Sequence, residues 1–207
     1  MGPDKTAQEH GTLAGFSRRT FLKATGGVVA MLGLGEVGRA MKRTELLRPP
    51  GGQDEASFLS RCLKCDRCRS VCPTSVIGVA RVEDGILNAR TPVMKFHIGH
   101  CTFCKKCVEV CPTEALTPFD IKTVKIGVAA VTDRCIAWNS GGCVVCHRAC
   151  PYHAILLDAQ NRPVVDSTKC NGCGLCERVC PALVLRTYID GKVRGIEVGL
   201  ASEGRAL

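Results

Sequence analysis

Cysteine is the residue whose number and spacing could do chemistry in this chain. The 207-residue sequence contains 16 cysteines, which fall into four groups of four, each ending at a Cys-Pro dipeptide. We call these groups tetrads 1 to 4. In chain order they are Cys62, Cys65, Cys68 and Cys72; Cys101, Cys104, Cys107 and Cys111; Cys135, Cys143, Cys146 and Cys150; and Cys170, Cys173, Cys176 and Cys180.

Tetrads 1, 2 and 4 read CxxCxxCxxxCP, whereas the first gap of tetrad 3 is enlarged. CxxCxxCxxxCP is the spacing with which bacterial ferredoxins hold [4Fe–4S] clusters through thiolates. The two-residue gaps wrap the backbone around one cluster, so that three sulfurs and several N–H groups converge on it. The fourth cysteine, before proline, points to a neighbouring cluster. The sequence therefore predicts four [4Fe–4S] clusters as cofactors, with all sixteen cysteines as iron ligands.

Zinc and disulfide bonds are the alternative uses of so many cysteines. Zinc sites favour CxxC pairs separated by a longer stretch, and four dense tetrads would crowd them. An even cysteine count suggests disulfides in an oxidising compartment, but disulfide scaffolds do not repeat CxxCxxCxxxCP. The spacing favours iron–sulfur clusters over both.

The pairing of the tetrads is less constrained than their chemistry. The segment 152–169 has the length and hairpin pattern of a two-cluster ferredoxin, so we pair tetrads 3 and 4, and by analogy tetrads 1 and 2. An arrangement in which the outer tetrads pair around the inner two stays open. The expected ligand sets are Cys62, Cys65, Cys68 and Cys111; Cys101, Cys104, Cys107 and Cys72; Cys135, Cys143, Cys146 and Cys180; and Cys170, Cys173, Cys176 and Cys150.

The segments around the tetrads must position these thiols. Residues 54–58 predict a short helix before tetrad 1, and a short helical or turn segment follows each Cys-Pro, as at 113–116 and 152–155. Short strands are expected before the later tetrads at 94–98, 128–132 and 164–166, with turns at 84–85 and 160–163. A closing hairpin is expected from 184–189, a turn at 190–191 and 193–198. This pattern predicts an α+β fold of tandem bacterial-type two-cluster ferredoxin-like modules.

The composition limits how large a hydrophobic core each domain can have. Aromatic residues make up only 4% of the chain, so an ordinary hydrophobic core would be thin, and cluster binding is expected to be coupled to folding. We expect a targeting region at 1–45, a linker at 46–60, a first ferredoxin-like module at 61–127, a second at 128–199 and a tail at 200–207.

The net charge of +9 does not indicate nucleic-acid binding. Residues 1–48 hold eight Lys or Arg and four Asp or Glu, so +4 of the charge lies there. Each oxidised cluster with four thiolates carries about −2, which leaves the loaded remainder mildly acidic. No interleaved basic and aromatic pattern is present. We therefore expect no nucleic-acid partner.

The N-terminal region carries an export signal. Residues 17–23 form a twin-arginine pattern around Arg18 and Arg19, followed by the weakly apolar residues 24–34. That run is too short to span a bilayer, which needs about 20 residues. The twin-arginine machinery transports folded, cofactor-loaded proteins, which fits this cargo. Residues 38–40 are a poor cleavage site, so cleavage of the leader stays open. The GxGxxG at 33–38 lacks the βαβ context of a dinucleotide site.

With these motifs in view, the chain resembles the MauM/NapG ferredoxin-type family, associated with periplasmic nitrate reduction and methylamine utilisation. The resemblance runs from the leader through tetrad 4, and its more diagnostic parts are residues 47–51 and the enlarged loop 135–143. Tetrad 2 is compact, where some members carry a longer gap, so the subfamily stays open. The resemblance implies a periplasmic protein, peripheral to the inner membrane. Its partners would be a polytopic quinol-oxidising iron–sulfur protein and a c-type cytochrome or terminal reductase.

No nucleophile–base pair or paired carboxylates indicate a catalyst, so we expect an electron-transfer subunit. The alternatives are the iron–sulfur subunit of a molybdenum oxidoreductase or hydrogenase complex, and a redox sensor with structural clusters. Because cysteines supply every expected ligand, we interpret the histidines near the tetrads and the only tryptophan as surrounding or packing groups. These residues are His97, His100, His147, His153 and Trp138.

Overall fold

The computed structural model describes residues 45–182 and 194–200. All described residues lie in one compact unit. The predicted leader with Arg18 and Arg19, residues 184–191 of the closing hairpin and the tail after residue 200 lie outside the described residues. Within the described part, no helix is long and apolar enough to cross a membrane.

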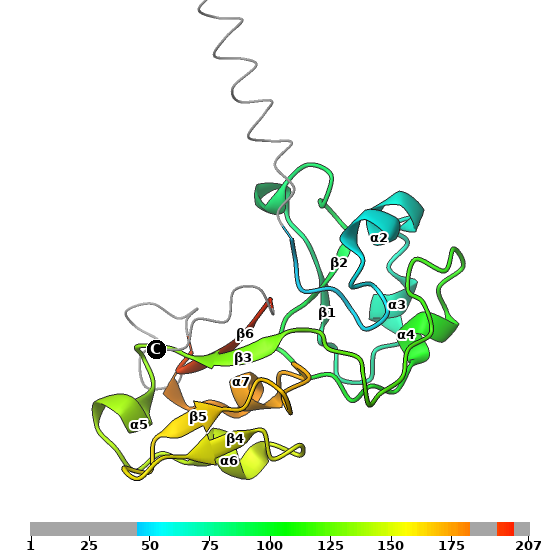
Figure 1. Cartoon of the computed structure of the whole chain (residues 1–207). Helices are drawn as coiled ribbons and strands as arrows, with labels where there is room; N and C mark the ends of the chain where they lie inside the picture. The colour runs from blue at the N-terminus through cyan, green and yellow to red at the C-terminus, as the bar shows by residue number, and fades with distance from the viewer. Residues whose placement is uncertain (1–44, 183–193, 201–207) are drawn as a thin grey trace, which may run out of the picture. The chain divides into compact units, whose positions relative to one another are not determined.

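Short helices and three two-stranded antiparallel sheets form the described part (Figure 1). Strand β1 pairs with β2, β4 with β5, and β3 with β6. The helices are α2 (Glu55–Arg61), α3 (Arg67–Ser70), the 3-10 helix η1 (Val82–Asp84), α4 (Lys106–Glu109), α5 (Ile136–Asn139), α6 (Val145–Ala149) and α7 (Leu175–Val179). The strands are β1 (Ile77–Val79), β2 (Pro92–Met94), β3 (Val128–Val131), β4 (Ile155–Leu157), β5 (Pro163–Val165) and β6 (Ile196–Gly199).

The helices α3, α4, α6 and α7 lie inside the tetrads, between the second cysteine and the fourth. The sequence analysis expected a helix or turn after each Cys-Pro; turns follow there, and residue 155 already begins a strand. The CxxxC gap is one helical turn long, which allows a helix before the last cysteine. The following proline disfavours helical backbone in the residue before it, and Cys150 and Cys180 are accordingly extended.

Several other expectations can be compared with these elements. The helix predicted at 54–58 is present as α2, because the Asp54 carboxylate accepts a hydrogen bond from the Ser57 N–H at 3.2 Å. The strand predicted at 94–98 was misplaced, since β2 ends at Met94. In the described part of the closing segment, β6 pairs with β3, with Val128 opposite Gly199. The chain end therefore closes against a strand that precedes tetrad 3.

The buried core is small and includes cysteines. Its largest apolar members are Phe58, Phe96, Phe103, Ile155 and Ile196, each at most 2% exposed. The thiol-bearing residues Cys107, Cys146, Cys170 and Cys176 are buried in the same cluster. Apolar side chains thus surround the tetrads rather than forming a separate core.

Candidate iron–sulfur sites

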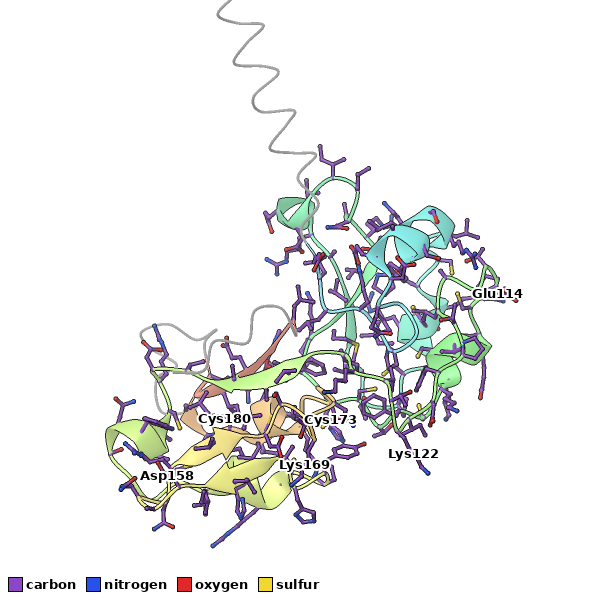
Figure 2. The ribbon with its side chains drawn as sticks, viewed as in Figure 1. Glu114, Lys122, Asp158, Lys169, Cys173 and Cys180 are labelled. Carbon is purple, nitrogen blue, oxygen red and sulfur yellow. The ribbon has the colours of Figure 1, made fainter. Side chains whose placement is uncertain are left out.

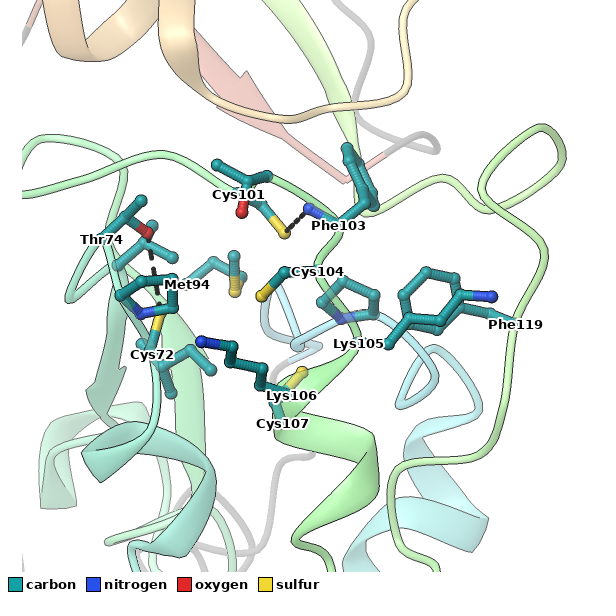
Figure 3. A pocket seen from close by; sticks show the side chains of 15 residues that line it. Cys72, Thr74, Met94, Cys101, Phe103, Cys104, Lys105, Lys106, Cys107 and Phe119 are labelled. Atoms are coloured by element: carbon teal, nitrogen blue, oxygen red, sulfur yellow. Dashed lines mark hydrogen bonds between the residues drawn. The ribbon is translucent and has the colours of Figure 1, made fainter.

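Three cavities in the described structure are each lined by four cysteines drawn from two tetrads. Figure 3 shows one of them, where Cys72 of tetrad 1 faces Cys101, Cys104 and Cys107 of tetrad 2. A second is lined by Cys62, Cys65, Cys68 and Cys111. The third is lined by Cys150, Cys170, Cys173 and Cys176.

The remaining four cysteines also lie near one another. Burial, together with the neighbouring thiols of Cys135, Cys143 and Cys180, raises the pKa of Cys146 to about 12. Each of the four groups therefore contains three cysteines of one tetrad and the Cys-Pro cysteine of its neighbour. These are the groups paired in the sequence analysis, and their assignment as cluster ligands stays a prediction.

Left-handed backbone residues bend each compact CxxCxxC loop around its cavity. They occupy the third and fifth positions of the loop: Lys64 and Asp66 in tetrad 1, Phe103 and Lys105 in tetrad 2, and Gly172 and Gly174 in tetrad 4. This geometry turns backbone N–H groups towards sulfur. The N–H of Phe103 donates to Cys101 Sγ at 3.4 Å, and the N–H of Ala129, from β3, donates to Cys170 Sγ at 3.4 Å.

Several buried or half-buried cysteines of the compact tetrads are harder to ionise when no cluster is bound. Burial raises the pKa of Cys68 and Cys101 to about 12 and of Cys107 to about 11, and neighbouring thiols add to the increase. Burial raises the pKa of Cys176 well above its usual value. Since thiolates are the form that binds iron, a bound cation must offset this cost.

Two of the Cys-Pro cysteines are in a different environment. Burial raises the pKa of Cys72, but hydrogen bonds from the Thr74 hydroxyl and from three backbone N–H groups outweigh it and lower the pKa. The same balance, with hydrogen bonds from Thr113 and backbone N–H groups, lowers the pKa of Cys111. Thr74 Oγ1 also lies 2.6 Å from the His100 carbonyl and 3.6 Å from Cys72 Sγ, so its single proton is shared between these two acceptors. The threonine two residues after each of these cysteines is a ligand-supporting group that the repeated Cys-Pro-Thr could have indicated.

The donor sets fit [4Fe–4S] clusters. All sixteen cysteines are free thiols, each of the three cavities presents four of them, and N–H groups point at sulfur from the loops. Across residues 45–182 and 194–200, no three His, Cys, Asp or Glu side chains stand close enough to share one metal ion. Thiols spaced around a cavity suit a polynuclear cluster better than a single tetrahedral zinc, whose bonds to sulfur are about 2.3 Å.

Exposure differs among the groups. Cys65 and Cys104 are exposed, whereas none of the cysteines of tetrads 3 and 4 is exposed. The groups also touch in series: the N–H of Cys101 donates to the carbonyl of Cys173 at 2.8 Å. Helix α3 of tetrad 1 contacts α4 of tetrad 2, and α6 of tetrad 3 contacts α7 of tetrad 4. Cys173 and Cys180, labelled in Figure 2, stand on either side of α7.

Buried Arg194 is a site residue that the sequence analysis missed. It is 5% exposed, and its guanidinium donates to the carbonyls of Glu177, at 2.6 Å, and Cys180, at 3.4 Å. It also donates to the carbonyl of His97 at 3.2 Å, while its Nε has no partner among the described residues. The guanidinium thus neutralises the C-terminal carbonyls of α7 next to a thiol. No motif distinguishes Arg194 in the sequence.

The four histidines and Trp138 are exposed or half-buried. His147 Nδ1 lies 2.6 Å from the Ile155 carbonyl. Trp138 Nε1 donates to the Pro163 carbonyl at 3.3 Å, and the Arg162 guanidinium stacks 4.3 Å from the Trp138 ring centroid. Trp138 therefore packs the enlarged loop of tetrad 3 against β5.

Residues 61–115 and 131–184 each match the 4Fe-4S dicluster domain family, and together they make up more than half of the chain. The chain belongs to the MauM/NapG ferredoxin-type family. We call 61–115 the first module and 131–184 the second. Residues 15–35 match the TAT (twin-arginine translocation) pathway signal sequence. The match in two tandem modules, each with eight cysteines, groups tetrad 1 with 2 and tetrad 3 with 4.

The similar proteins include the methylamine utilization ferredoxin-type protein MauM of Methylophilus methylotrophus, 34% identical over 65% of this chain and 66% of that protein. The ferredoxin-type protein NapG of Escherichia coli is 33% identical over 61% of this chain and 62% of its own. NapF of the same organism is 31% identical over 65% of this chain and 80% of its own. The chain thus spans less than two thirds of the MauM and NapG lengths.

Proposed function

We propose that this family member is an exported electron-transfer subunit that carries four [4Fe–4S] clusters, one in each group of four thiols. When bound, such clusters supply one-electron chemistry. The observation that carries the proposal is that twelve of the sixteen free cysteines line three shared cavities, four to each, within tandem dicluster domains.

The contacts between groups support one serial order. The group with Cys65 is next to the group with Cys104, which is joined to the group with Cys173 by the backbone hydrogen bond from Cys101. The group with Cys143 comes last, beside Cys176. The spatial order thus differs from the sequence order, because tetrad 4 lies between tetrads 2 and 3. The two end groups, with Cys65 and Cys143, are the expected points of exchange with partners.

The location and partners follow the family resemblance and the leader. The twin-arginine signal supports export to the periplasm. A membrane-bound quinol-oxidising iron–sulfur protein is the expected donor, and a c-type cytochrome or terminal reductase the expected acceptor. Replacing Arg18 and Arg19 by lysine should retain the protein in the cytoplasm, as measured by cell fractionation. Unchanged export would contradict the assigned route.

A potentiometric titration tests the proposed function. Oxygen-free full-length protein should show four one-electron reductions when the titration is monitored by EPR. The spectra should also show magnetic coupling between neighbouring centres. A protein without reducible centres, or one whose centres cannot be reoxidised by an acceptor, would contradict electron transfer.

A further inference from the structure

A cluster of exposed apolar side chains lies beside the thiol loop of tetrad 1. Leu63 is 67% exposed, Val82 70%, Ile86 60% and Leu87 51%; we call these four residues the Leu63 patch. The Lys64 ammonium donates to the Leu87 carbonyl at 3.2 Å, which joins the tetrad 1 loop to the loop 82–87. Exposed apolar side chains gathered on two joined loops are typical of interaction surfaces.

A buried polar network holds the loop 82–87 in place. Arg48, 2% exposed, donates to Thr91 Oγ1 at 2.7 Å and to Asn88 Oδ1 at 2.9 Å. Asn88 in turn donates to the Asp84 carbonyl at 2.9 Å, so the base of the loop is fixed while its apolar side chains face solvent. The residue 47–51 motif thus contributes Arg48 to this network, while its Pro50 lines the cavity of the Cys104 group. The hydrogen-bond network therefore holds the loop in a conformation that keeps the patch exposed.

Basic side chains outnumber acidic ones along the two loops, since residues 61–90 hold six Lys or Arg and three Asp or Glu. Arg61, Arg67, Arg81 and Arg90 are exposed, and Lys64 bridges the loops. Two of the nearby carboxylates have local partners: Asp66 faces Arg69 at 3.9 Å, and Asp84 accepts from the Arg81 N–H at 2.8 Å. An apolar centre with a cationic rim is complementary to a protein surface with an apolar centre and an acidic rim.

The position of the patch identifies the kind of partner. Leu63 and the exposed Cys65 both line the mouth of the Cys62–Cys111 cavity, so a protein on the patch would lie against the first end group. The exposed carboxylate of Glu83 lies between Val82 and Ile86, which disfavours insertion of this loop into lipid. We propose that the Leu63 patch docks a redox protein with an acidic rim. This inference rests on the proposed electron-transfer function.

Binding can be measured without electron transfer by titration calorimetry of the oxidised, cluster-loaded full chain. The probes are oxidised mitochondrial cytochrome c, which is basic, and the same cytochrome with its lysines succinylated, which is acidic. We expect the succinylated form to bind at least about tenfold more tightly at low salt, and this preference to shrink as salt screens the rim.

Apolar variants test the centre of the patch. Val82→Ser, Ile86→Ser and Leu87→Ser together should weaken binding of the succinylated cytochrome by about fivefold or more. The matched control is Leu156→Ser with Val164→Ser, which removes apolar side chains that are 48% and 46% exposed on the hairpin β4–β5. The control should bind as the unmodified sequence does.

Rim variants test the charge. Arg81→Gln with Arg90→Gln should lower the association rate about threefold or more, measured by stopped flow. The control Lys122→Gln with Arg148→Gln removes the same charge from exposed positions elsewhere and should have a smaller effect.

Equal effects of test and control variants, or a preference for the basic cytochrome, would overturn the docking proposal. A second result would also overturn it: the apolar variant loses co-sedimentation with anionic phospholipid vesicles but binds the cytochrome as before. That result would assign the patch to a lipid surface. Iron content and stepwise reduction of the unmodified chain report on the proposed function separately. If those succeed while the patch variants bind normally, only the docking proposal fails.

Discussion

The two modules use one loop motif in two environments. In the first module, side-chain-bearing residues such as Lys64 and Lys105 occupy the left-handed positions, and two thiols are exposed. In the second, Gly172 and Gly174 occupy these positions and no cysteine is exposed. A left-handed position with room for a Cβ tolerates a side chain at some cost in backbone strain, whereas one where a Cβ would meet neighbouring atoms requires glycine.

The contacts of the glycines explain this difference. A Cβ on Gly174 would lie 1.9 Å from the Phe96 ring, and one on Gly172 would lie 2.5 Å from the backbone of Gly127. Both contacts are with residues outside tetrads 3 and 4. The second module's thiols are therefore covered by the rest of the chain, and the first module's thiols provide the accessible end.

The largest expected difference between the modules comes from removing a ligand. Cys173→Ala should lose at least one cluster, about a quarter of the iron, and destabilise the buried second module because ligation is coupled to folding. Cys65→Ala, at the exposed rim, should lose at most about a quarter of the iron and leave the second module intact. Iron and sulfide analysis with EPR measures both. Full iron content with normal reduction in Cys173→Ala would contradict its assignment as a ligand.

The second largest expected difference between the modules comes from replacing a glycine of a thiol loop. Gly174→Ala should cost about 2–4 kcal/mol, because it combines a left-handed alanine with a clash against a buried ring. Lys105→Ala changes the corresponding residue of tetrad 2, where a Cβ is already present, and should cost less than about 1 kcal/mol. Guanidinium unfolding of the loaded proteins compares them. Similar midpoints for the two variants would contradict the packing difference.

Arg194 should contribute both to the free energy of unfolding and to the reduction potential of the group that contains Cys180. Arg194→Met removes a buried charged donor from the carbonyls of Glu177 and Cys180, and should cost about 2–4 kcal/mol. Loss of this positive charge should also lower the reduction potential of the group containing Cys180. Arg178→Met, at an exposed neighbouring position, is the control. A potential unchanged in Arg194→Met would limit the residue to a structural role.

The smallest effect concerns pH. Burial raises the pKa of Glu177 to about 7, although the Val198 N–H donates to it and lowers the pKa. Its negative charge therefore develops as pH rises through about 7, and a nearby negative charge disfavours an added electron. The potential of the Cys176 group should fall by a few tens of millivolts at most between pH 6 and 8. Glu177→Gln should flatten this dependence in voltammetry, and an unchanged slope would assign it to another group.

The groups of thiols that lie together in the structure could be predicted from the sequence, because cysteine spacing is dictated by the chemistry of cluster binding; that they ligate clusters stays a prediction. The helix at α2 was also predictable, since Asp54 is a local capping residue. By contrast, the pairing of β6 with β3, the coverage of Gly174 by Phe96 and the placement of Arg194 depend on contacts between distant segments. Local propensity carries no information on such contacts, so the sequence could not separate an exposed from a buried module.

The iron and acid-labile sulfide content of oxygen-free protein tests the central claim most directly. Four clusters require about sixteen iron and sixteen sulfide per chain, and the absorbance should bleach on reduction. Well-folded protein that is colourless and poor in iron under these conditions would contradict the account.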